Sequence, residues 1–226
     1  KLVWSQSYEV LNRFCPPRWR QLNAIGEPAL TGWDPPSSLL RPTNTEAMGY
    51  LQRLAVEGSD IMAAAGLTPH VQVGEPWWWD GSFTDSRPCI YDPDTIDAYP
   101  AETGKSVPEP FVDSVFADVP AGSDLEAFLS WLGDKLGDST LAIRDATKAA
   151  HPSAQCSVLF FTPQILNPLS RVAQLINFPD TQWAHPAWDY VQIEDYDWLI
   201  NGEFDLHATT FDAATVNLGY DRATEV

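Results

Sequence analysis

The fold prediction depends on one stretch, His70-Val71-Gln72-Val73-Gly74-Glu75-Pro76-Trp77-Trp78-Trp79-Asp80. Val71 and Val73 alternate with polar or small residues, which is the period-two pattern of a half-buried β-strand. Pro76 ends this strand because proline supplies no backbone donor and holds the residue before it in an extended conformation. The stretch therefore predicts that Glu75 lies at the carboxyl end of a strand, directly before three indoles.

A second stretch, residues 190–198, repeats this pattern. It alternates from Tyr190 to Glu194 and continues with acidic and aromatic residues, including Tyr196. In parallel α/β folds the carboxyl ends of the strands meet at one edge, where binding and catalytic groups gather. We therefore expect Glu75 and Glu194 to open onto one cleft. Of the two carboxyl groups, that of Glu75 is expected to have the raised pKa.

Three further segments are predicted as strands. Residues 156–162 form a nearly continuous apolar run, which is typical of a strand buried on both faces of a parallel sheet. Residues 2–8 alternate in polarity, and residues 111–116 show a weaker strand pattern.

Helices are predicted between these strands. Capping-box patterns at Thr43–Glu46 and Ser123–Glu126 open two of them, the first closing at Gly66. A separate helical segment is predicted at 140–150, a short helix at 169–176 and a weak helical pattern from Ala208 onward.

The order of these elements predicts an α/β fold. Neither a glycine-rich nucleotide fingerprint nor a phosphate-binding loop is present, so a (β/α)₈ TIM-barrel-like domain is favoured over an open nucleotide-binding sheet. We expect one domain over residues 1–226, with long irregular loops at 14–42 and 80–120. Because a closed barrel needs eight strands, the chain is expected to supply part of a barrel. The other strands would come from another segment or another chain.

The composition narrows the function classes. The 226 residues carry a formal net charge of −18, which disfavours nucleic acid as a partner and is compatible with neutral glycans. No stretch is apolar enough to predict a membrane span, and no signal-peptide pattern opens the chain. The chain starts without methionine inside a predicted strand, so we expect a processed product or a piece of a longer polypeptide.

Neither a metal site nor a cofactor is predicted. Cys15, Cys89 and Cys156 are odd in number and widely spaced, so they are expected to be buried free thiols. The histidines lack metal-ligand spacing. Aspartates cluster at 80–97 without EF-hand spacing, which favours a solvated acidic loop over a calcium site.

Two carboxylates at strand ends suit glycoside hydrolysis by retention, with one as protonated acid and the other as nucleophile. Glu75 is the candidate acid, because proline and tryptophans surround it, and Glu194 is the candidate nucleophile. At least one indole beside Glu75 is expected to be exposed as a platform for a sugar ring. The substrate-binding candidates are Gln6, Tyr8, Trp33, Trp77, Trp78, Trp79 and Tyr196.

A structural interpretation stays open beside this one. Each glutamate could simply end a strand and pair with a backbone amide or an arginine. The arginines available for such pairs are Arg13, Arg18, Arg41 and Arg87.

Around Glu75 and Glu194 the chain resembles the retaining (β/α)₈ glycoside hydrolases, whose acid/base glutamate lies in an Asn-Glu-Pro motif. Here the motif reads Gly74-Glu75-Pro76, so glycine replaces the asparagine that would bind the sugar 2-hydroxyl. This departure favours a barrel that has lost catalysis.

A more particular resemblance is to glycosidase-like barrels of tail-tip or hub (baseplate) proteins in long-tailed bacteriophages and gene-transfer-agent particles. The motifs that carry it are Trp4-Ser5-Gln6-Ser7-Tyr8-Glu9, Gly32-Trp33-Asp34-Pro35-Pro36-Ser37, Val73–Trp79 and Ile90-Tyr91-Asp92. The resemblance implies a structural protein of the virion tail that contacts other tail-tip or hub subunits, or the rest of a longer polypeptide. It also implies that the barrel binds, and in an active member cleaves, host-surface glycan. Two alternatives remain: an active retaining glycosidase, and a non-viral carbohydrate-binding or scaffolding domain.

Overall fold

The computed structural model describes residues 2–82, 85–223 and 226. Phe83 and Thr84, which fall in the predicted irregular segment 80–120, lie outside the described residues. The centre of the fold is a four-stranded sheet in the order β1-β4-β5-β6, and every neighbouring pair is parallel. Its strands are β1 (Trp4–Ser7), β4 (His70–Gly74), β5 (Gln155–Phe161) and β6 (Tyr190–Glu194). The strands predicted at 2–8, 70–75, 156–162 and 190–194 are thus confirmed.

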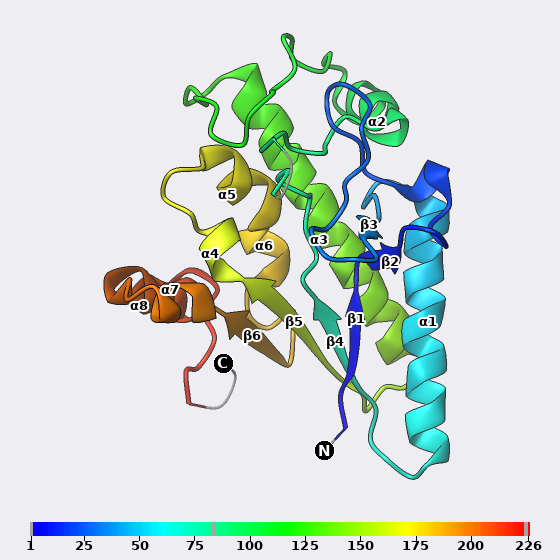
Figure 1. Ribbon diagram of the computed structural model, residues 1–226. Helices are drawn as coiled ribbons and strands as arrows, with labels where there is room; N and C mark the ends of the chain where they lie inside the picture. The colour runs from blue at the N-terminus through cyan, green and yellow to red at the C-terminus, as the bar shows by residue number, and fades with distance from the viewer. Residues whose placement is uncertain (1, 83–84, 224–225) are drawn as a thin grey trace.

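Helices connect the parallel strands. The connection from β1 to β4 contains α1 (Thr45–Ala64), and the connection from β4 to β5 contains α3 (Asp124–Ala150). Between β5 and β6 the chain forms α4 (Thr162–Ile165), α5 (Arg171–Asn177) and α6 (Asp180–Trp183). Figure 1 shows α1 and α3 running alongside the sheet. This is the predicted α/β fold with a parallel sheet.

The barrel is not closed within the described residues. The sheet has four strands, half the number in a (β/α)₈ barrel, and β1 and β6 are its edges. The prediction that the chain supplies part of a barrel is therefore confirmed. The source of the other strands stays a prediction.

One face of the sheet is apolar and lies against the helices. Val71 and Val73 of β4 and Val158 and Phe160 of β5 are buried in the main core with residues of α1, α3 and α5. The ring of Phe160 stacks on that of Trp183 in α6, with 5.2 Å between centroids. These side chains alternate along each strand, so the other face carries a different set.

The other face is polar. The Ser5 hydroxyl donates to Gln72 Oε1 over 2.6 Å, and the Gln72 amide donates to Gln192. Ser157 completes the row by donating to Gln192 Oε1 over 3.2 Å. In a closed barrel this face would form the interior, which is usually filled by branched apolar residues.

The helices differ from their predicted form in two places. The segments predicted as separate around residue 140 belong to one helix, α3, because one buried face, which includes Leu136, Thr140 and Ile143, runs through both of them. Its predicted cap is confirmed: Ser123 accepts from the Glu126 amide. The α1 cap is Asn44, which accepts from the Ala47 amide over 2.8 Å, so the prediction of Thr43 is wrong.

The predicted strand at 111–116 is also wrong. The segment has no regular structure, and the Val115 amide donates to the Ser86 carbonyl, outside any sheet. The predicted loop 80–120 contains α2 (Pro93–Thr103), and the predicted loop 14–42 contains β3 (Ser37–Leu39). β3 pairs antiparallel with β2 (Glu9–Leu11), which precedes that loop.

Four short elements complete the described chain. They are η1 (Pro17–Trp19), α7 (Tyr196–Ile200), α8 (Phe204–Asp212) and the π-helical η2 (Ala213–Asn217). No helix in the described part of the chain combines the length and apolarity that crossing a bilayer would need. Cys15, Cys89 and Cys156 are buried free thiols, as predicted.

Candidate functional site

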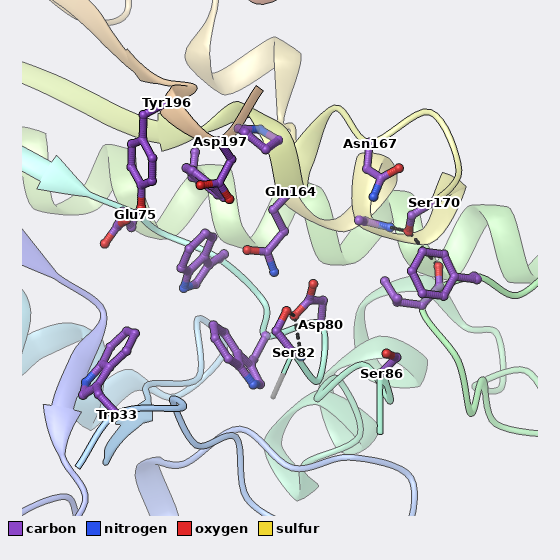
Figure 2. Close-up of a pocket in the computed structure, with 17 residues that line it drawn as sticks. Trp33, Glu75, Asp80, Ser82, Ser86, Gln164, Asn167, Ser170, Tyr196 and Asp197 are labelled. Carbon is purple, nitrogen blue, oxygen red and sulfur yellow. Dashed lines mark hydrogen bonds between the residues drawn. The ribbon is translucent and has the colours of Figure 1, made fainter. Parts of the chain in front are cut away.

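A cavity of about 450 Å³ opens where the strands of the sheet end. Its walls come from the segments that follow β4, β5 and β6, together with the loop that carries Trp33 (Figure 2). Residues brought together there from distant parts of the chain include Trp33, Glu75, Trp77, Trp79, Asp80, Phe161, Gln164, Tyr196 and Asp197. A cavity therefore lies at the edge of the sheet where the sequence predicted a site.

Glu75 has a left-handed backbone conformation, with φ of 48°. The expectation that Pro76 would hold it extended is wrong, since the chain must turn sharply away from β4 at this point. The Glu75 amide still donates to the Leu159 carbonyl of β5 over 2.9 Å, so the residue stays attached to the sheet. A non-glycine residue in this region costs about 1–3 kcal/mol, which the surrounding structure must offset. Such strain often marks a functional position.

The charge state of Glu75 is perturbed. Its carboxyl group is more than half buried, and this burial, together with the nearby charge of Glu194, raises its pKa above the usual range. Glu194 is the last residue of β6, and its own pKa is raised by partial burial and by Asp197. The parallel sheet thus brings the two glutamates to the same end. Glu194 lies beside the cavity, however, and is not among the described residues that line it.

A third glutamate belongs to this acidic group. Glu9 of β2 has a pKa raised to about 7, mainly by burial and also by the charge of Glu75, while a hydrogen bond from Ser37 opposes the shift. Despite this accumulation, the described residues contain no group of histidine, cysteine or carboxylate side chains arranged to hold a metal ion. The charge of Glu75 raises the pKa of Glu9, and the charge of Glu194 raises the pKa of Glu75, so neighbouring acids in this group repel one another.

The tryptophan triplet divides between the cavity and the core. Trp77 and Trp79 line the cavity, but Trp77, Trp78 and Trp79 are only 6%, 0% and 3% exposed. The expectation that one of them is substantially exposed is wrong. Trp78 points into the core and donates from Nε1 to the Leu132 carbonyl over 2.9 Å. The rings of Trp77 and Trp79 pack edge-to-face, with centroids 5.8 Å apart, which covers them.

The exposed aromatic rings of the cavity come from other segments. Trp33 is 50% exposed and Tyr196 is 49% exposed, and both line the cavity. In Figure 2 the Tyr196 ring reaches toward Glu75, and Trp33 lies on another side of the same space. These two rings fit the sugar-platform role better than the triplet does.

Gln6 and Tyr8 lie away from the cavity. The Gln6 amide donates to the Leu51 carbonyl of α1 over 2.8 Å, and the Tyr8 hydroxyl is 2.7 Å from that of Ser139 in α3. Burial raises the pKa of Tyr8. Both side chains lie on the helix-covered side, so the structure does not bring them together with Glu75.

Two buried amide side chains hold the triplet in place, and neither was predicted from the sequence. Gln21 donates to the Trp77 carbonyl over 2.9 Å and accepts from the Trp79 amide over 2.8 Å. Asn177 accepts from the Trp78 amide over 2.7 Å and donates to the Trp78 carbonyl over 2.9 Å. A single sequence offers no signal for them, because nothing in it shows that these two amides are buried.

The structure also explains the glycine before Glu75. A Cβ atom at Gly74 would lie 3.2 Å from Ser5 Oγ and 3.7 Å from Gln72 Oε1. An asparagine there would require the polar row on the open face to shift. The close approach of Ser5 and Gln72 therefore favours glycine over the asparagine of the Asn-Glu-Pro motif at this position.

The arginines considered as structural partners are engaged elsewhere. Arg18 pairs with Glu46, and Arg87 pairs with Asp85. Arg41 pairs with Asp92 and Asp94, and Arg13 lies over the ring of Phe14. Among the described residues, none of these four arginines forms an ion pair with Glu75 or Glu194.

A parallel βα arrangement with a cavity at the carboxyl ends of its strands places the protein in the α/β class. The chain belongs to the family of TIM-barrel domains of non-contractile tail sheath proteins, whose model matches residues 1–225. It is therefore a structural component of a phage tail and is located in the virion tail. A comparison with curated proteins found no match. The sequence had suggested the tail tip or hub, whereas the family description names the sheath.

Proposed function

We propose that this tail domain binds a host-surface glycan in the cavity beside Glu75 and does not cleave it. The observation that carries the proposal is the pairing of two half-exposed rings, Trp33 and Tyr196, with a partly buried carboxylate in one cavity. Aromatic faces stack on the apolar faces of sugar rings, and carboxylates accept hydrogen bonds from sugar hydroxyls. A volume of about 450 Å³ lies within the range of small-ligand sites.

A retaining glycosidase is the second candidate. The raised pKa of Glu75 favours it, because a general acid must keep its proton near neutral pH. Two features oppose it: Glu194 lies outside the cavity wall, and Gly74 offers no side chain to the sugar 2-hydroxyl. For this reason binding without turnover is the better-supported function.

The test is isothermal titration calorimetry with oligosaccharides prepared from the host cell surface. Trp33→Ala and Tyr196→Ala should each weaken binding about 2-fold to 10-fold, the usual effect of losing one aromatic contact. Phe204→Ala is the matched control, because Phe204 is a similarly exposed ring on α8 outside this cavity. Chromatography of the same mixtures should show intact oligosaccharide. Equal affinity for all four proteins would refute the site, and released sugar would favour the glycosidase.

The proposal includes an assembly role, since tail proteins function among other tail subunits. The two edge strands, β1 and β6, are where further strands would pair to complete the barrel, and the polar face would then line its interior. Such strands would come from another segment of a longer polypeptide or from a neighbouring subunit at the sheath, tip or hub.

A further inference from the structure

Among its described lining residues, the cavity beside Glu75 has acidic side chains and no basic side chain to balance their negative charge. Three carboxylates from two segments line it: Glu75 and Asp80 in the connection after β4, and Asp197 in α7 (Figure 2). Among the described residues that line the cavity there is no lysine, arginine or histidine. The cavity is therefore a site of negative potential.

The surroundings of the cavity add to this potential. Glu194 and Glu9 lie close enough to be coupled to Glu75 by charge repulsion. The chain as a whole has a net charge of −18, so distant residues do not reverse the sign. A bound cation would relieve repulsion that the folded protein otherwise retains.

The cavity wall also presents groups that a ligand could satisfy. The indole N–H of Trp77 is buried in this wall and has no acceptor among the described residues, and the same holds for the Gln164 amide nitrogen. Trp33 and Tyr196 add exposed ring faces, which attract organic cations as well as sugar rings. The buried N–H donors suit a ligand that carries hydroxyl groups, and the carboxylates and aromatic faces suit one that carries positive charge.

We propose that the cavity prefers glycans with free, protonated amino groups over the corresponding N-acetylated or neutral glycans. This inference rests on the proposed glycan-binding function and specifies its ligand class. An ammonium group on the sugar would donate to the carboxylates of Glu75 and Asp197, while the sugar ring stacks on Trp33 or Tyr196. Anionic glycans would be repelled by the same carboxylates.

The test compares three probes in calorimetry at low salt: a β-1,4-linked glucosamine tetramer, its fully N-acetylated form and a glucose tetramer of the same linkage. A charge-assisted hydrogen bond to a carboxylate should make the glucosamine tetramer bind roughly 10-fold to 100-fold tighter than the other two. Added salt should reduce this preference, because the cavity is open to solvent.

Glu75→Gln removes the carboxyl group that would accept from the ammonium group and should lower the preference for the glucosamine tetramer at least several-fold. Glu57→Gln makes the same change on the exposed surface of α1 and should leave the preference unchanged. Equal binding of all three probes, or equal loss in both variants, would overturn the inference while leaving glycan binding intact. If none of these probes and no host-surface oligosaccharide binds, the proposed function fails together with the inference.

Discussion

Replacing Asn177 with alanine tests whether buried amides hold the cavity wall in place. Asn177 is fully buried and makes two hydrogen bonds to the Trp78 backbone, of 2.7 and 2.9 Å. The substitution leaves a buried N–H and a buried C=O without partners, and each costs about 1–3 kcal/mol. We therefore expect the free energy of unfolding to fall by about 2–5 kcal/mol, a large part of the stability of an ordinary domain.

Equilibrium urea unfolding, followed by tryptophan fluorescence, measures this change. With an m-value of about 2 kcal/mol per M, the midpoint should fall by roughly 1–2.5 M. Asn201→Ala is the control, because Asn201 is exposed at the end of α7, and it should change stability by less than about 0.5 kcal/mol. If Asn177→Ala is as stable as the control with an unchanged m-value, the amide does not hold the triplet.

Three other predictions concern helix contacts, pH and the open sheet. Gly133→Ala in α3 should destabilise the protein by about 1–3 kcal/mol, because the new Cβ would lie 2.3 Å from the Leu175 carbonyl oxygen of α5. In Gly49→Ala of α1 the new Cβ meets only the end of a flexible arginine, so this variant should be neutral or stabilising. Thermal unfolding of both variants measures the difference, and equal losses of stability would show that the contact with Leu175 is not the cause. Stability should fall as pH rises from about 4.5 to about 7, because folded Glu9 keeps a proton there that the unfolded chain has released. Urea titrations across this range should show a smaller slope for Glu9→Gln; an unchanged slope means that Glu9 is not the group responsible. Finally, amide hydrogen exchange in β1 and β6 should be much slower in assembled tails than in the isolated domain, and equal rates would mean that no further strands pair there.

The sheet could be predicted from the sequence because its signals are local. Alternation in β4 and β6 and the apolar run of β5 are read directly from neighbouring residues, and their parallel order follows from the intervening helices. The strand prediction at 111–116 was wrong because its two valines, Val112 and Val115, are buried in the main core without pairing to a strand, which gives a strand-like pattern of apolar residues. Pairing of β2 with β3 depends on contacts across the irregular loop, which local patterns do not show.

The candidate site could be predicted in part. Glu75 and Glu194 were placed at one end of the sheet because strand direction fixes where strand ends lie. The exposure of the indoles could not be predicted, since it depends on how Trp78 fits under α3 and how Trp77 packs on Trp79. Gln6 was misplaced for a related reason: alternation gives two faces, but it does not say which face the helices cover.

The central claim is that a tail-sheath barrel domain binds glycan in the cavity beside Glu75 without cleaving it. A crystal structure of the domain with a bound host-surface oligosaccharide tests this most directly. If the cavity binds glycan without turnover, sugar density will lie against Trp33 or Tyr196, within hydrogen-bonding distance of Glu75 and with the glycosidic bonds intact. Sugar bound at another surface, or a cleaved product in the cavity, would contradict it.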